Sequence, residues 1–205
     1  MGVDKSELPR PVWVASRLLW GLLAAGAVLA IAGATELNFL NGNLPVIAEK
    51  STFLAEAEKS AGRMHDSASL ALGLGIFNMV GALVFWPVLA RGMRMGRAFI
   101  FVFVAFVAAS HVMLILQDGT IGVQPYEDMS HDLVQQELIN SLLVWPGYFP
   151  MLYPAESAGL ILAFLIGWKM LQEPTIEHFQ QRRRVTTDRV WDVSEILAKR
   201  ENGVS

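Results

Sequence analysis

The stretch Ser67–Ala90 reads SASLALGLGIFNMVGALVFWPVLA and contains no charged side chain. A helix needs about 20 apolar residues to cross the roughly 30 Å hydrocarbon core of a bilayer, so this run predicts a membrane span. Three other stretches of similar length carry almost no charge. The sequence therefore predicts four spans, at about residues 14–35, 67–90, 98–117 and 151–171.

The composition supports this assignment. Of the 205 residues, 53% are hydrophobic and 17% are charged, and the charged residues cluster between the uncharged runs. There is no cysteine, which excludes disulfides, thiolate metal sites and cysteine nucleophiles. We expect an all-α integral membrane four-helix bundle over residues 1–172, with the first run a span rather than a cleaved signal peptide, and a cytoplasmic tail over 173–205.

Charge asymmetry predicts the orientation. The short turn after the second run contains Arg91, Arg94 and Arg97, whereas the connection 118–136 contains acidic residues and no Lys or Arg. Because positively charged loops stay in the cytoplasm, both termini are expected there. We expect the protein in a plasma membrane. Abundant Ala, Gly and Val, with more Arg than Lys, indicate a bacterial source, for which this is the inner membrane.

Two connections on the outer side have patterns of their own. Residues 36–66 read as a hydrophilic link, with a short helix around Ser51–Ala61 preceded by turn formers at Asn38, Asn41, Gly42, Asn43 and Pro45. The stretch Ser130–Val144 has helical apolar spacing, with Ser130 as the expected N-cap. We expect it to form an interfacial helix on the outer membrane face.

The stretch Trp145–Glu156, WPGYFPMLYPAE, leads into the last span. Proline removes a backbone donor and biases the preceding residue away from helix, so three prolines at every fourth position predict an irregular segment. Its aromatic residues suit a membrane interface, or alternatively a docking lip for a partner or lipid. The aromatic residues are Trp145, Tyr148, Phe149 and Tyr153, of which Trp145, Tyr148 and Tyr153 are the predicted interaction residues.

Glu156 is expected inside the membrane. Only about twelve uncharged residues separate it from Lys169, too few to cross, so the last span must begin near Met151. At 1.5 Å per residue, Glu156 then lies roughly 8 Å below the outer boundary, and His111 lies at about 9 Å. Buried ionisable residues usually mark a pathway or a site, although Glu156 can equally be a hydrogen-bonded structural residue.

His65, His111 and Glu156 form the candidate metal site. Together with Glu36 and Asp66 they would make a polar cluster in the outer leaflet, and two histidines with carboxylates can bind a transition metal. No two of them stand at i,i+4 on one helix, so such a site depends on tertiary packing. The alternative is a hydrogen-bonded cluster, and no cofactor is predicted beyond this metal or haem alternative.

Small residues recur every fourth position in the last span, at Ala155, Gly159, Ala163 and Gly167. Such rows let helices approach closely. The row predicts packing inside the bundle, with contact to a partner subunit or a second copy as the alternative. Shorter rows occur at residues 26, 30 and 34 and at 67, 71 and 75.

The tail carries two further features. Arg182, Arg183 and Arg184 follow the last span and can hold anionic lipid headgroups, although a role as a topology anchor fits them equally well. Thr187–Lys199 has the spacing of a cytoplasmic amphipathic helix, for which the membrane, the bundle or another protein could be the contact.

No nucleotide-binding loop, nucleophile elbow or zinc-protease helix is present, and nothing indicates nucleic acid as a partner. The first hypothesis is a non-enzymatic accessory or interaction subunit of a plasma-membrane assembly. The second is a small redox, metal or haem enzyme subunit that uses the outer His/Glu cluster. The third is a transporter or lipid-binding protein with Glu156 in the pathway.

Overall fold

The computed structural model describes residues 8–93, 95–121, 126 and 132–180. Apart from short turns, these residues are helical. The main helices, in chain order, are α1 (Arg10–Lys50), α2 (Leu54–Arg91), α3 (Gly96–Ile121), α4 (Leu133–Leu143) and α5 (Tyr148–Leu171).

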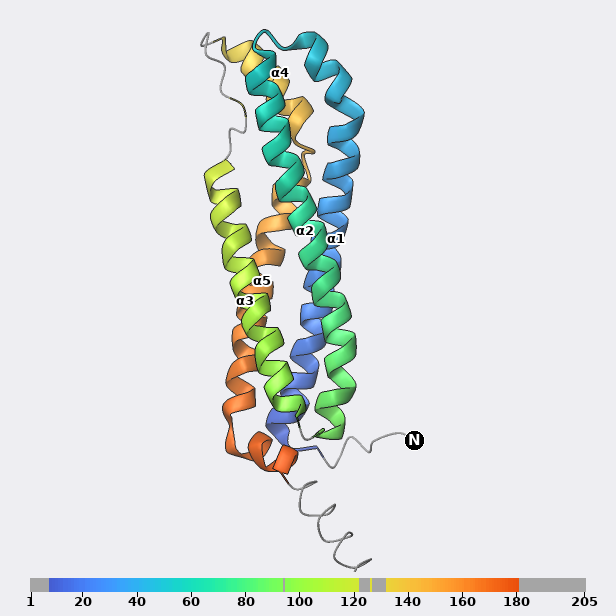
Figure 1. Cartoon of the computed structure of the whole chain (residues 1–205), viewed down its shortest axis with the longest axis vertical. Helices are drawn as coiled ribbons and strands as arrows, with labels where there is room; N and C mark the ends of the chain where they lie inside the picture. The colour runs from blue at the N-terminus through green and yellow to red at the C-terminus, as the bar shows by residue number, and fades with distance from the viewer. Residues whose placement is uncertain (1–7, 94, 122–125, 127–131, 181–205) are drawn as a thin grey trace, which may run out of the picture.

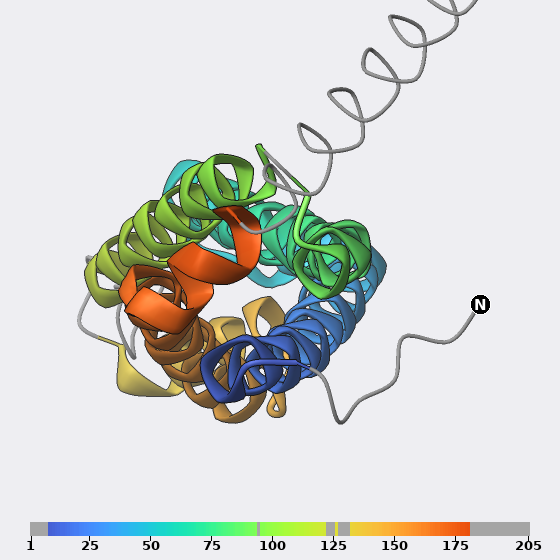
Figure 2. The same cartoon turned by 90° about the horizontal axis from the view of Figure 1, so that it is seen from below.

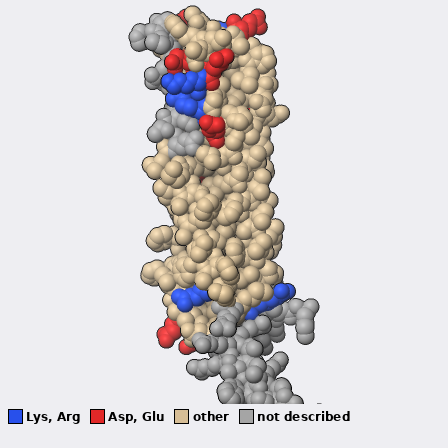
Figure 3. Space-filling model, in the orientation of Figure 1, with Lys and Arg blue, Asp and Glu red and all other residues tan. Residues whose placement is uncertain are grey.

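The predicted four-span all-α architecture is confirmed. Four helices are long and apolar enough to cross a membrane: α1, α2, the part Gly96–Leu116 of α3, and α5. They lie side by side along the long axis of the molecule (Figures 1 and 2), with α1 against α2 and α5, and α3 against α5 and α2. On the face drawn in Figure 3, charged side chains lie near the two ends of the bundle and leave a long uncharged belt between them. The chain is a multi-pass membrane protein.

Two helices continue well past the predicted spans. The 41 residues of α1 give a length of about 62 Å, twice the thickness of a hydrocarbon core. The expected turn at residues 38–45 is wrong, because this stretch is helical throughout and includes Pro45. Leu40 and Ile47 are 1% and 2% exposed, and their burial against α2 outweighs the weak helix propensity of the Asn and Gly residues nearby.

The projecting ends of α1 and α2 pack with α4 into a unit that we call the head, comprising residues 37–50, 54–66 and 133–143. Ile139 and Leu143 of α4 are fully buried there. Gln135 Nε2 donates to the Lys50 carbonyl at 2.7 Å, and Asn43 Nδ2 donates to the Leu142 carbonyl at 3.2 Å. The buried face of α4 therefore contacts protein, and its placement at a membrane interface stays a prediction.

The N-cap of α4 is Asp132, not Ser130. Its Oδ1 accepts hydrogen bonds from the backbone N–H groups of Val134 and Gln135, at 3.0 and 3.2 Å. An aspartate in this position satisfies donors of the first turn and places negative charge at the positive end of the helix dipole. Ser130 lies outside the described residues.

The aromatic-proline stretch is also more regular than expected. Only Pro146 precedes α5, which begins at Tyr148. Pro150 stands in the first turn, where backbone N–H groups have no partner within the helix, so it costs no hydrogen bond. Pro154 lies inside α5 and removes one bond, which a membrane helix tolerates. The prediction of an irregular segment was wrong because the prolines fall where few donors are needed.

Contact between α1 and α2 is close enough to bring backbone against backbone. A Cβ on Gly75 would lie 2.5 Å from the backbone nitrogen of Ala30 and 2.5 Å from the carbonyl oxygen of Gly26. A Cβ on Gly33 would lie 2.5 Å from the Ala68 carbonyl oxygen. Of the two shorter small-residue rows, the one at 67, 71 and 75 is buried throughout, whereas in the row at 26, 30 and 34 Gly26 is buried against α2 and Ala34 is exposed.

After α5 the chain turns back under the bundle. Residues 173–180 are helical and cross its lower end (Figure 2). His178 Nε2 bonds to the Leu89 carbonyl at 3.2 Å, and Thr175 Oγ1 donates to the Lys169 carbonyl at 2.9 Å. These side chains satisfy carbonyls in the last turns of α2 and α5. The predicted helix Thr187–Lys199 and the arginines at 182–184 lie outside the described residues.

We expect Gly75→Ala to lower the free energy of unfolding by about 1–3 kcal/mol, because the added methyl group forces two backbones apart. The measurement is unfolding of the purified protein by sodium dodecyl sulfate in mixed micelles. Gly73→Ala is the matched control, since a Cβ there meets nothing within 4 Å. Equal stability of the two variants would contradict the close α1–α2 packing.

Candidate functional site

Buried polar side chains lie along the inside of the bundle. In an apolar environment such groups are costly, so their positions are where function is to be sought. The polar residues that are less than 2% exposed are Glu36, Ser60, Ser67, Asn78, His111, Glu156 and Thr175.

His111 and Asn78 connect α3 to α2. Asn78 Nδ2 and His111 Nε2 are 3.0 Å apart, and both residues are 0% exposed. The imidazole lies against Gly159 of α5, where a Cβ would come within 2.2 Å of the ring carbon Cε1. Gly159 therefore provides the space that the ring occupies, and three helices meet at His111.

Glu156 lies on the same helix as Gly159, three residues earlier, and is 1% exposed. Three residues correspond to about 5 Å along a helix. Glu156 is thus inside the bundle and close to the level of His111, in agreement with the depth arithmetic from the sequence. It does not face lipid.

Two atoms of the His111 group have bonding capacity left. His111 Nδ1 and Asn78 Oδ1 are buried and have no hydrogen-bond partner among the described residues. The Asn78 amide nitrogen can only donate, so His111 Nε2 accepts the hydrogen bond between the two residues and the neutral imidazole carries its proton at Nδ1. The pair therefore keeps one free donor, Nδ1–H, and one free acceptor, Asn78 Oδ1.

A second polar group lies nearer the head. Tyr148 OH and Ser67 Oγ are 2.8 Å apart, and Tyr148 is fully buried. Glu36 Oε2 accepts a hydrogen bond from the backbone N–H of Trp145 at 2.9 Å. Glu36 therefore fixes the turn that leads into α5.

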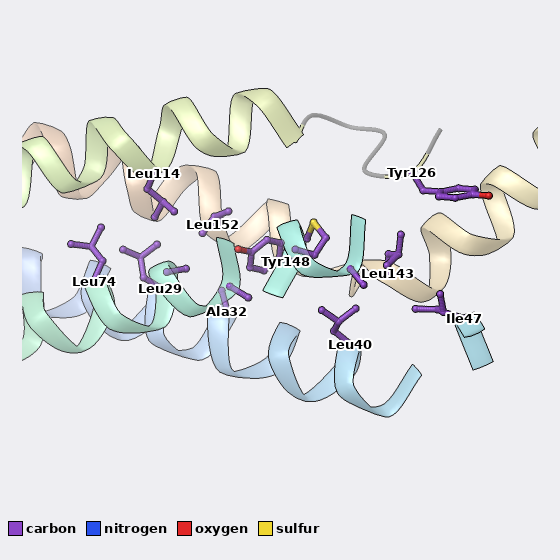
Figure 4. Packing of buried hydrophobic residues seen from close by; sticks show 14 of the residues in the cluster. Leu29, Ala32, Leu40, Ile47, Leu74, Leu114, Tyr126, Leu143, Tyr148 and Leu152 are labelled. Atoms are coloured by element: carbon purple, nitrogen blue, oxygen red, sulfur yellow. The ribbon is translucent and has the colours of Figure 1, made fainter. Parts of the chain in front are cut away.

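Leucines separate the two polar groups. Leu29, Leu74, Leu114 and Leu152 fill the interior beyond the Tyr148 hydroxyl (Figure 4). Ser67 and Asn78 are eleven positions apart on α2, about 16 Å along the helix. A leucine layer of this kind interrupts a direct chain of hydrogen bonds between the Ser67–Tyr148 pair and the Asn78–His111 pair.

The expected metal set is not brought together. His65 is on the exposed side of α2, 3.9 Å from Asp66, which is also exposed. It precedes Asn78 by thirteen positions, or about 20 Å along the helix, so it cannot share an ion with His111. Within the described ranges no group of three or more His, Cys, Asp or Glu side chains is arranged to hold a metal. Of His65, His111 and Glu156, only His111 and Glu156 lie at a similar level in the bundle.

Most of the residues predicted for interaction with a partner are buried inside the bundle. Ala155, Gly159 and Ala163 are buried, and a Cβ on Gly167 would touch Val104 of α3 at 3.6 Å. The row therefore packs within the bundle, and its two glycines lie against α3. Of the three aromatic residues, Tyr148 is buried and Trp145 is half-buried. Tyr153 is 42% exposed and stacks on Phe149, so it alone offers a large ring surface outward.

Asn78 is the residue whose role the sequence did not reveal. It is the one amide in the second predicted span, and that isolation was the available signal. Its pairing with His111 depends on the relative shift of α2 and α3, which the apolar pattern does not specify. No protein-family model, no curated protein and no solved structure matches the chain.

The Asn78–His111 bond can be measured by a double-mutant cycle with Asn78→Leu and His111→Leu. We expect a coupling energy of about 0.6–1.7 kcal/mol, from the average to the maximum found for hydrogen bonds between membrane helices. Unfolding free energies of the four proteins provide the test. The control cycle pairs Asn78→Leu with Ser110→Ala, which should be additive, and additivity within about 0.3 kcal/mol in both cycles would refute the bond.

Proposed function

We propose that this chain is a non-enzymatic accessory protein of the plasma membrane that binds another protein through its head. The observation that carries the proposal is an apolar groove of about 460 Å³ in the head, between the projecting ends of α1 and α2. It is lined by Leu40, Leu44, Ile47, Ala48, Leu54, Glu58, Ala61, Gly62 and His65.

The groove has a buried floor and exposed walls. Leu40 and Ile47 are covered by the helices themselves, whereas Leu44 and Leu54 are 40% and 43% exposed. The groove lies on the part of α1 and α2 that extends beyond the length needed to cross a bilayer, and lipid tails do not cover apolar side chains there. Concave apolar surfaces of this size are typical of binding sites.

The charge of Glu58 in the groove indicates the kind of protein segment that would bind there. Glu58 lines the groove and forms no ion pair with any residue in the described part of the chain, although the neighbouring Lys59 pairs with Glu56. His65 lies at the same groove. We therefore expect a protein segment that places apolar side chains between Leu44 and Leu54 and a Lys or Arg beside Glu58.

The four spans act as the anchor in this proposal. The surface of α3 and α5 carries large apolar side chains that suit lipid, among them Val102 at 69% and Phe164 at 73% exposure. The bilayer is thus the second partner, and the arginines of the tail remain the candidates for anionic headgroups.

A second candidate is transport or redox chemistry at the buried polar residues, favoured by the proximity of His111 and Glu156. Two features weigh against it: the leucine layer, and the lack of a third metal-binding side chain near them among the described residues. A stoichiometric metal or a Soret absorption band in the purified protein would overturn the accessory proposal. A proton flux into vesicles that Glu156→Gln abolishes would do the same.

The head groove is tested by placing a photoreactive amino acid at Ala48, which lines the groove and is exposed. In membranes of the native host, irradiation should give one discrete adduct larger than the monomer. Glu58→Lys in the same chain should reduce that adduct at least several-fold, because a basic partner is then repelled.

The matched control places the photoreactive residue at Gly42, an exposed position on α1 where a side chain meets nothing within 4 Å. It should give no adduct of that size. The same adduct from both positions, or one from Ala48 that ignores Glu58→Lys, would exclude the groove as the binding surface.

A further inference from the structure

A second groove, of about 510 Å³, lies between α2 and α3. Its lining is almost wholly apolar and includes Leu70, Gly73 and Phe77 of α2 with Phe106, Ser110 and Met113 of α3. We propose that this groove binds one hydrocarbon chain of a membrane lipid. The proposal is independent of the head groove, because it concerns the membrane-crossing part of the molecule.

The position of the groove indicates where its occupant comes from. Leu70 is only three residues, or about 5 Å, inside the start of the uncharged run at Ser67. The groove then follows α2 as far as Phe77, a further 10 Å or so. It therefore occupies the half of the bilayer nearer the head, at the depth where the acyl chain of a lipid in that leaflet lies.

A missing side chain forms the groove. Gly73 is exposed, and a Cβ there would meet no atom within 4 Å. Leu70 and Phe77 lie about one helical turn before and after Gly73, and their side chains border the groove on α2. Phe77 and Phe106 meet edge to face with ring centroids 5.0 Å apart, and they bound the groove between the two helices.

The groove is closed toward the interior of the bundle. Leu74 and Leu114 both line it and both belong to the buried core, with exposures of 9% and 2%. His111 lies behind them and is fully buried. A bound chain would thus lie on the side of the bundle, separated from the buried polar residues.

The rim favours a lipid chain over a protein helix. Membrane helices pack closely where small residues line the contact on both sides. Here Leu70, Phe77 and Met113 are 51%, 38% and 67% exposed and stand around a single glycine. A helix about 10 Å across would rest on these side chains and leave the groove unfilled, whereas a chain of methylene groups fits between them.

The test uses the full-length protein in vesicles of phosphatidylethanolamine and phosphatidylglycerol that contain a phosphatidylglycerol with a diazirine in its acyl chain. After irradiation, labelled peptides are quantified by mass spectrometry. We expect Met113 to be labelled at least several-fold more than Phe164, which is comparably exposed on α5, at 73%. Equal labelling of the two positions would overturn the proposal.

A groove-filling variant gives the second arm. Gly73→Trp should reduce labelling at Met113 several-fold and leave Phe164 unchanged, whereas Gly42→Trp, also at an open position but outside the groove, should change neither. If Gly73→Trp does not fold, the ratio of labelling at Met113 to labelling at Phe164 in the unmodified protein still tests the proposal. Labelling at Met113 that survives Gly73→Trp would exclude a bound chain.

Discussion

The close contact between α1 and α2 is the interaction on which the rest of the structure depends. Glycines at 26, 33 and 75 bring the two backbones together over several turns, and only helices without side chains at those points can do so. The contact fixes the register of the pair, and with it the level of Ser67 and Asn78 on α2. The polar groups inside the bundle and the projecting head both follow from that register.

Much of the fold could be predicted from the sequence, because an uncharged apolar run of about 20 residues is rarely anything but a membrane span. Local signals failed where tertiary packing decides. Asn38 and Pro45 favour a turn in isolation, but burial of Leu40 and Ile47 keeps α1 helical. Pro154 does not interrupt α5, since a membrane helix loses only one hydrogen bond to it. Helix ends remain the least predictable part.

The candidate site divides in the same way. The shared level of Glu156 and His111 follows from length arithmetic, because depth depends on position along one helix. Which side chains meet depends on how the helices are rotated and shifted against each other. The Asn78–His111 hydrogen bond and the exposure of His65 therefore could not be predicted from the sequence. In the small-residue row, Gly159 leaves the space that the His111 imidazole ring occupies. The four-residue spacing alone does not distinguish this role from helix packing.

Helices α1 and α2 continue without a break from the membrane-crossing part into the head, and this continuity has a mechanical consequence. A helix interrupted at the membrane boundary would form a hinge, so that a load on the outer part would be lost in bending. Here each helix of the hairpin runs for about 20 Å in the head and for about 40 Å in the membrane-crossing part, so the head is the shorter arm of one continuous rod. A load applied to the head is therefore carried along α2 to the side that packs on α3.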